Sequence, residues 1–305
     1  MSKMSFRAAA EKWLPEHLAL CGAEHQQRVH NLFTRWAYPT LGKQAINRIT
    51  PQQIVVCIKA HEQHAPSVAP LLLQKISKLY HYAKAMGWAR YNPAEGLHIV
   101  LKPIKYKGFN FVQPEKMPEF LAAVDTFTDP EAAETVAFWL ICHTAVRRAE
   151  AVQADLREVD FDRALWTIPA ERIKTRQPHI VPLSEPVLEL LHKWLAQRQQ
   201  QGITGNRLFG DLPLHRPIET IRKAGYDGKM TLHGCRKVFS TAAHESGLWG
   251  IDAIELQLAH TIGGVRGVYN KAQYLDERRR LMDWYSSELQ RWRNIGHGGY
   301  NGVLR

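Results

Sequence analysis

The sequence lacks the patterns that mark several large classes of protein. No stretch approaches the roughly 20 consecutive apolar residues of a membrane-spanning helix, so we expect no association with a membrane. The four cysteines lie far apart and form no C-x-x-C pair, which argues against a zinc ribbon and favours reduced thiols in the cytoplasm. Carboxylate clusters and glycine-rich phosphate loops are also missing, so we expect neither a metal ion nor a cofactor.

Positive charge is what the sequence has in excess. Its 305 residues include 40 Lys and Arg against 29 Asp and Glu, which gives a formal net charge of +11. This balance favours a polyanionic partner, and nucleic acid is the commonest one. A protein that is merely basic is the alternative when charge is considered alone.

The first hundred residues predict helices, because apolar side chains recur there with the spacing of a helix face. The helix expected to end at Gly87 carries a row of basic residues on its polar face: Lys75, Lys78 and Lys84. Their spacing could follow a phosphate backbone, although a solvated basic face is an equal alternative. Residues 107–113 mix lysine, glycine and aromatics, and we expect them to form a basic linker. Lys105, just before the linker, and Lys107 within it would touch DNA.

Helical spacing returns from Pro114, and only 159–183 contains short β-favourable runs. We therefore predict a mainly α fold with an N-terminal helical domain at 1–106 and a second domain at 114–305. The second domain is expected to be α-helical with a small antiparallel sheet.

Four short segments of the second domain concentrate cations and hydrogen-bonding side chains. They read TAVRRAE at 144–150, RIK at 172–174, HGCR at 233–236, and LAH at 258–260 followed by Tyr269. In this order they resemble the active-site boxes of the tyrosine recombinase (phage integrase) family, and the resemblance covers nearly the whole chain. The segments IPAERIKTRQPHIVPLS and VYNKAQYLDERRR are similar to integrases of satellite phages and genomic islands.

The resemblance implies a role for each matched position. The expected catalytic residues are Arg147, Lys174, His233, Arg236, His260 and Tyr269, with Glu150 in support. Ala145 replaces the usual glycine of the first box, which should matter little if its φ stays negative. Lys237 stands where many members of the family have a second histidine.

Elementary chemistry supports these assignments. Negative charge concentrates on a phosphodiester as a nucleophile attacks it, and the planar forks of Arg147 and Arg236 suit its oxygens better than lysine would. Ionising a tyrosine at pH 7 costs about 4 kcal/mol, which nearby cations or a base such as His233 would reduce. His233 could equally hydrogen-bond the phosphate. Lys174 is the candidate acid for the leaving 5′-oxygen, and His260 either binds the phosphate or orients Arg236.

Two other tyrosines compete with Tyr269 for the role of nucleophile. Tyr274 falls outside the expected distance from His260, and Tyr285 fits the apolar stripe of the last helix, so we expect Tyr285 in the core. Arg148 falls one place off the arginine motif, and Glu150 is expected to hold the arginine box through an ion pair.

The resemblance also implies partners and a mechanism. It predicts a helical core-binding (SAM-like) domain and a catalytic domain that together clamp double-stranded DNA, a 3′-phosphotyrosyl intermediate, and a homotetramer on two sites. The arm-binding domain of island integrases is expected to be absent, and an accessory directionality factor is left open. Three alternatives are a type IB topoisomerase-like relaxase, a non-catalytic DNA-binding regulator on the same scaffold, and an RNA-binding protein.

Overall fold

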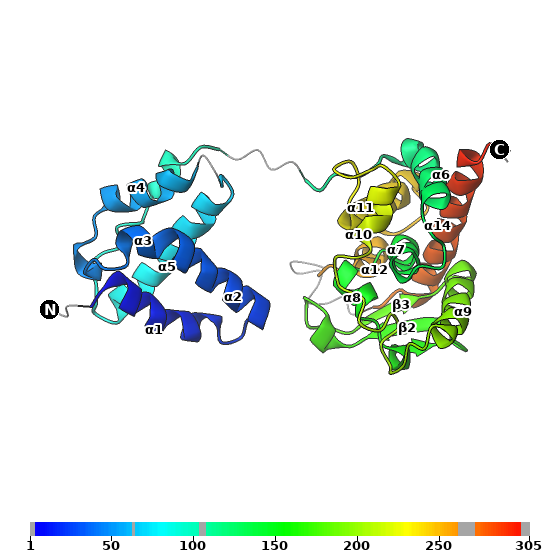
Figure 1. Ribbon diagram of the computed structural model, residues 1–305, viewed down its shortest axis with the longest axis horizontal. Helices are drawn as coiled ribbons and strands as arrows, with labels where there is room; N and C mark the ends of the chain where they lie inside the picture. Colours follow the sequence, from blue (N-terminus) through cyan, green and yellow to red (C-terminus); the bar gives the residue numbers. More distant parts are fainter. Residues whose placement is uncertain (1–3, 63–64, 104–107, 262–271, 300–305) are drawn as a thin grey trace. The chain divides into compact units, whose positions relative to one another are not determined.

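The computed structural model describes residues 4–62, 65–103, 108–261 and 272–299. The chain divides into two compact units, Met1–Tyr106 and Lys107–Arg305, each with its own apolar core (Figure 1). Both units are mainly helical, and a small antiparallel sheet lies in the second. The predicted fold class is therefore confirmed. No described helix is both long and apolar enough to cross a membrane.

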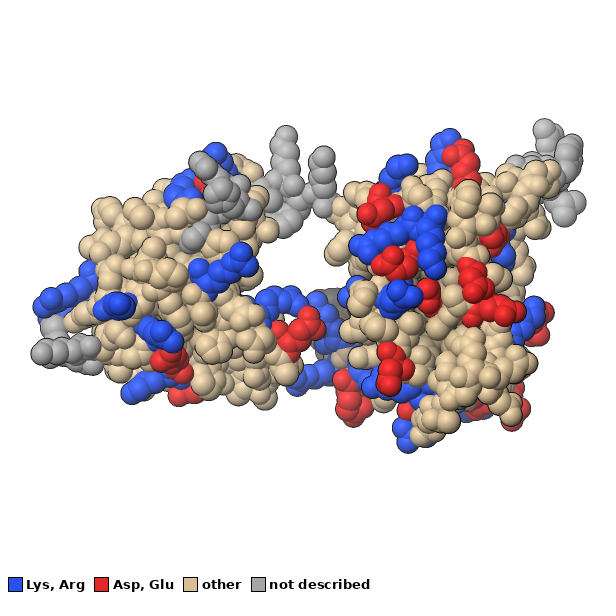
Figure 2. Space-filling view, viewed as in Figure 1, with Lys and Arg blue, Asp and Glu red and all other residues tan. Residues whose placement is uncertain are grey.

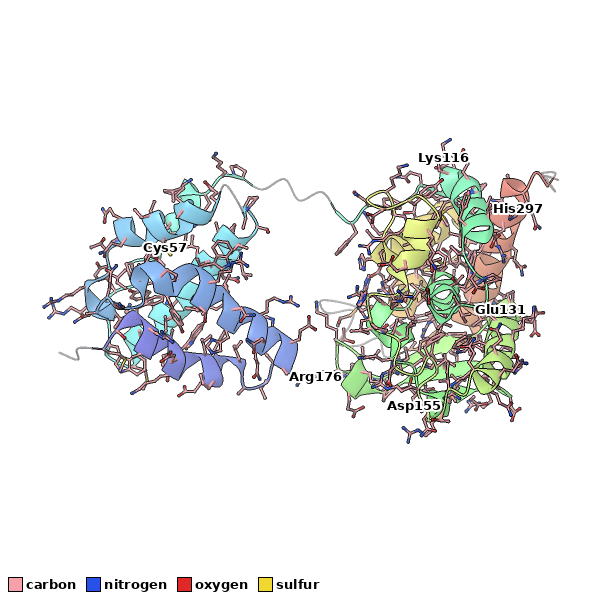
Figure 3. All side chains as sticks on the ribbon, in the orientation of Figure 1. Cys57, Lys116, Glu131, Asp155, Arg176 and His297 are labelled. Carbon is pink, nitrogen blue, oxygen red and sulfur yellow. The ribbon has the colours of Figure 1, made fainter. Side chains whose placement is uncertain are left out.

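The N-terminal unit is built from five helices in its described part. They are α1 (Phe6–Leu18), α2 (Ala23–Leu32), α3 (Tyr38–Leu41), α4 (Pro51–Glu62) and α5 (Val68–Ala85). A π-helical turn at Phe33–Ala37 joins α2 to α3. Aromatic rings fill the core, where the Tyr80 hydroxyl donates to the carbonyl of Ile46 at 3.1 Å and Cys57 is buried (Figure 3). Gly87, with φ of 71°, follows the end of α5 as predicted.

The second unit is organised around α7 (Ala133–Thr144), in which every residue from Glu134 onward is buried. Figure 1 shows α7 in the middle of this unit, and neighbouring helices pack on it from several sides. The other α-helices among its described residues are α6 (Met117–Phe127), α8 (Arg148–Val152), α9 (Glu185–Gln200), α10 (Ile218–Lys223), α11 (Leu232–Ser246), α12 (Ile251–Gln257) and α14 (Leu275–Gly296). A helix buried on all faces requires apolar side chains all round, which explains why the sequence of α7 has no polar stripe.

The sheet has three antiparallel strands in the order β1 (Val159–Asp160), β2 (Leu165–Ile168) and β3 (His179–Pro182). Trp166 pairs with Val159 on one side and Val181 on the other. All three strands lie where the β-favourable runs predicted them. The connection from β2 to β3 carries the RIK segment.

The polar face predicted for α5 is narrower than its sequence suggests. Lys75 is only 7% exposed and its Nζ lies 3.4 Å from Nε2 of His17 on α1, so little of its side chain is open to a ligand such as DNA. Burial, and then the charge of Lys78, lower its pKa. Packing of α1 against α5 covers this position, whereas Lys78 and Lys84 are exposed.

The predicted linker is partly ordered against the second unit. Val112 is buried in the core of that unit, and Asn110 contacts α11. Lys105 and Lys107 lie outside the described residues. Figure 2 shows Lys and Arg beside Asp and Glu on the visible face of the second unit, so net charge alone does not mark a binding face there.

Candidate active site

Two helix ends with left-handed turns form the base of the site. Helix α7 ends at Ala145, which has φ of 53° and donates its N–H to the Ile141 carbonyl at 2.9 Å. The condition under which the replacement of glycine should matter little, a negative φ at Ala145, is therefore not met, because the chain must reverse there to leave the helix. Helix α12 ends in the same manner at Ala259, with φ of 48°. Both turns expose carbonyl oxygens at the negative end of a helix dipole.

Arg236 on α11 is held by these carbonyls. Its Nη1 donates to the carbonyl of Ala145 and its Nη2 donates to that of Leu258 at 2.6 Å, while the side chain is 3% exposed. Burial, and then the charge of Arg147, lower the pKa of Arg236 to about 10. The guanidinium therefore remains charged at neutral pH, inside the protein and close to a second cation.

Arg147 lies between the two helix ends and caps α8. Its Nη1 forms an ion pair with Glu150 Oε1 at 2.9 Å, and its Nη2 donates to the Ala259 carbonyl at 3.2 Å. Glu150 is 2% exposed and also accepts the backbone N–H of Arg147 at 2.8 Å. The ion pair predicted for Glu150 is thus present. Arg148, the neighbouring arginine, is exposed.

The connection from β2 to β3 is anchored beside Arg147. Arg172 donates to the carbonyl of Glu150 at 2.6 Å and pairs with Glu158. Two residues later, Lys174 is exposed in a turn that also contains Arg176, labelled in Figure 3. The base of the hairpin is therefore fixed to the arginine box, while the predicted acid faces solvent.

His233 lies in the first turn of α11, exposed and with its ring centroid 4.4 Å from that of Phe109. The segment that contains Phe109 crosses α11 at Gly234, where a Cβ would approach the Asn110 carbonyl to 2.7 Å. Partial burial lowers the pKa of His233, and the next causes are the charges of Arg236 and Arg147. The candidate base and both arginines therefore share one electrostatic environment.

Tyr269 lies outside the described residues, so its position relative to the arginines is not described. Of its two rivals, Tyr285 is 1% exposed, and burial raises its pKa, as expected for a core residue. Tyr274 lies at the start of α14, and its hydroxyl donates to Asp252 at 3.4 Å. Both rivals thus have structural contacts of their own.

The sequence did not reveal a buried network beneath the site. Arg278, 1% exposed, donates to Gln257 Oε1 and to the Ile180 carbonyl, and lies 3.2 Å from His179 Nε2. Gln257 in turn donates to the Thr144 carbonyl at 2.9 Å. The network thus joins β3, α7, α12 and α14. Arg278 could have been found, because it precedes Leu281 and Tyr285 at helical spacing on an otherwise apolar stripe.

A second missed residue is Glu255. Its Oε2 lies 2.8 Å from Nδ1 of His260, and Nε2 of the same ring lies 3.4 Å from Arg236 Nη2. In the described ranges, no three His, Cys, Asp or Glu side chains are placed to hold a metal ion. Among the predicted site residues that the structure describes, Arg147, Glu150, Arg236 and His260 lie together. His233 lies nearby.

Comparison with known proteins identifies the family. Residues 6–99 match the phage integrase central domain, and residues 110–275 match the phage integrase family. The integrase of Shigella phage Sf6 is 32% identical over 291 residues, which cover 93% of this chain and 75% of that protein. The prophage integrase IntZ of Escherichia coli is 30% identical, with coverages of 93% and 71%. The integrase of Enterobacteria phage P4 is also 30% identical, with coverages of 95% and 70%.

Solved structures share the fold at lower identity. A Tn1549 transposon integrase in complex with circular intermediate DNA superposes with a TM-score of 0.70 at 13% identity, covering 92% of this chain and 99% of that one. A lambda integrase dimer bound to a core site gives 0.64 at 14% identity, with coverages of 89% and 97%. From the family matches and the curated relatives, the chain belongs to the phage integrase family and is a site-specific recombinase.

Proposed function

We propose that this chain cleaves and rejoins duplex DNA through Tyr269, with Arg147 and Arg236 as the clamp on the scissile phosphate. The observation that carries the proposal is that the two guanidiniums are held by carbonyls from two neighbouring helix ends. A guanidinium has five N–H donors, and these carbonyl and carboxylate contacts use only some of them. The remaining donors can bind the non-bridging oxygens of a phosphate, where charge concentrates in the transition state.

The proposed reaction exchanges one phosphate ester for another. The Tyr269 oxygen bonds to phosphorus as the bond to the 5′-oxygen breaks, which leaves a 3′-phosphotyrosyl intermediate and a free 5′-hydroxyl. His233 accepts the phenol proton; its lowered pKa keeps it neutral, and so able to act as a base, at pH 7. Lys174 gives a proton to the leaving oxygen. Rejoining reverses these steps with the 5′-hydroxyl of another strand, and the ester energy is retained.

The same proposal assigns the DNA contacts and the domains. Residues 1–106 would clamp the duplex, residues 114–305 would catalyse, and 107–113 would link them. Lys78 and Lys84 are exposed, and Lys105 and Lys107 add charge near the link. Contacts of this kind supply affinity without sequence readout. We propose that the protein acts in the cytoplasm.

We also propose assembly as a homotetramer on two DNA sites. A lambda integrase tetramer bound to a Holliday junction shares the fold, with a TM-score of 0.65 at 13% identity, over 84% of this chain and 77% of that one. Recombinant products from two marked duplexes test this assembly directly. A relaxase of the topoisomerase type would act on one duplex and give none.

A nicked suicide substrate tests the nucleophile. Cleavage releases a short fragment from such a substrate, so the covalent protein–DNA complex accumulates and is counted on a denaturing gel. Tyr269→Phe should abolish this complex and leave DNA binding largely intact, because the phenol oxygen forms the bond. Tyr274→Phe is the matched control and should still form the complex. A covalent complex with Tyr269→Phe would show that the nucleophile is a different residue.

A further inference from the structure

We propose that Glu255 is a positioning residue, which fixes the tautomer and orientation of His260 and, through that ring, aims Arg236 at the phosphate. The inference rests on the proposed function, because it assigns Glu255 to the same site. Glu255 does not touch Arg236 through any hydrogen bond described here. The hydrogen-bonded route from Glu255 to Arg236 therefore runs through His260.

The end of α12 brings Glu255 and His260 together. His260 donates its backbone N–H to the Glu255 carbonyl at 3.0 Å, and Ala259 donates to Leu256 at 3.0 Å. These two bonds and the left-handed Ala259 form a Schellman motif, which folds the chain back over the last turn of the helix. In this motif the residue after the turn lies beside the one five positions earlier. In most Schellman motifs these two side chains form an apolar contact. Here the carboxylate of Glu255 faces the imidazole of His260 instead.

The contacts at the ring determine its tautomer. A carboxylate can only accept a hydrogen bond, so the 2.8 Å contact with Glu255 places a hydrogen on Nδ1 of His260. Nε2 of the neutral ring then carries a lone pair, and it lies 3.4 Å from Arg236 Nη2, which can donate to it. Without Glu255, either nitrogen could carry the hydrogen. An Nε2–H group would then oppose an Arg236 N–H group.

The surroundings of Arg236 show how Glu255 could act on it, by charge or by orienting the ring. In the described part of the chain, the Arg236 guanidinium hydrogen-bonds the carbonyls of Ala145 and Leu258 and lies within 3.4 Å of the His260 ring. Glu150, which pairs with Arg147, and Glu255 are the two carboxylates that raise the pKa of Arg236 against the effect of burial. His260 and Glu255 are 44% and 35% exposed, so solvent screens their charges. The orientation of the ring should therefore matter more than the attraction between charges.

The first test measures covalent trapping on the suicide substrate. Glu255→Gln should slow cleavage about 10- to 100-fold, the usual cost of removing a group that orients a functional histidine. The glutamine can present its NH₂ to Nδ1 and thereby favour the other tautomer. Glu245→Gln is the matched control, since Glu245 is exposed on α11, and it should cleave at the wild-type rate. DNA affinity and thermal midpoint should be unchanged in both variants.

A double-mutant cycle separates this role from a general structural one. In a His260→Ala background, Glu255→Gln should have little further effect on cleavage, because the hydrogen-bonded route to Arg236 is gone and only the solvent-screened attraction between the two charges remains. An equal loss in both backgrounds would overturn the proposal. A wild-type rate for Glu255→Gln alone would do the same.

Histidine ¹⁵N chemical shifts give a readout without any reaction. The His260 signal, assigned by its loss in a His260→Gln variant, should report the Nδ1–H tautomer in the wild type and a shift toward Nε2–H in Glu255→Gln. A wild-type protein that never traps DNA would refute the proposed function, while this signal would still decide the role of Glu255. An Nε2–H tautomer in the wild type would refute that role.

Discussion

The site's two arginines differ in burial and in contacts from its two candidate proton-transfer residues. Arg236 is 3% exposed, and the Arg147 side chain is 25% exposed; backbone carbonyls at helix ends hold both. His233 and Lys174 are exposed, one in the first turn of α11 and the other in a turn between strands. The guanidiniums of the proposed clamp are therefore oriented by the protein itself, whereas the proposed proton-transfer groups lie on the surface.

This difference follows from what each group must do. Electrostatic stabilisation is most effective when the donors are already oriented, because no reorganisation is needed during the reaction. Carbonyls of two helix ends provide such an orientation at low cost, since each helix end has carbonyls without helical partners. A proton donor or acceptor must instead reach atoms of the substrate, so a surface position suits it. The two groups should then respond differently to substitution, to substrate chemistry and to pH.

The largest effect is expected at the clamp. Arg236→Lys should reduce the cleavage rate about 1,000-fold or more, because one ammonium cannot reach both carbonyls and still offer a fork to the phosphate. Arg148→Lys, one residue after Arg147 and exposed, is the control and should have little effect. Single-turnover trapping on the suicide substrate measures both. Cleavage by Arg236→Lys within tenfold of wild type would remove this residue from the clamp.

Lys174→Ala should reduce cleavage by about 100- to 10,000-fold, the usual contribution of a general acid. A substrate with sulfur in place of the bridging 5′-oxygen should restore most of the rate, since a thiol, with a pKa near 8.5, leaves without a proton. The same substrate should not restore Arg236→Lys, whose defect lies at the non-bridging oxygens. Equal restoration of both variants would contradict the division between clamp and acid.

The pH dependence of cleavage should move with the charge near His233. Its pKa lies below the usual 6.5, so the base is lost only as pH falls below that value, and the acid limb of the rate profile should lie there. The charge of Lys237 is one cause of the lowering, and its Nζ lies 4.3 Å from the Phe111 ring. Lys237→Gln should therefore shift the acid limb to higher pH by less than about one unit. No shift, or a shift to lower pH, would argue against His233 as the base.

The sequence predicted elements that repeat a local pattern and missed features that depend on contacts between elements. The three strands followed from β-favourable runs, and the order of the boxes led to the candidate site residues. The burial of Lys75 was not foreseen, because α1, more than fifty residues away, covers it. Glu255 was missed because its contact with His260 depends on a left-handed turn at an alanine, and alanine does not signal such a turn.

The smallest effect is expected in the backbone that holds the clamp. Ala145 and Ala259 both have positive φ, which costs an L-residue roughly 1–2 kcal/mol that glycine avoids. Glycine also gains entropy in the unfolded chain, which offsets about 0.4–1 kcal/mol. Ala259→Gly should thus raise the free energy of unfolding by up to about 1 kcal/mol in urea titrations, because the Ala259 methyl is only partly buried and little packing is lost with it. Ala137→Gly, inside α7 with ordinary helical geometry, is the control and should lower it. If both substitutions destabilise the protein, alanine is not strained at the turn after α12, and the carbonyl that accepts from Arg147 is presented without conformational cost.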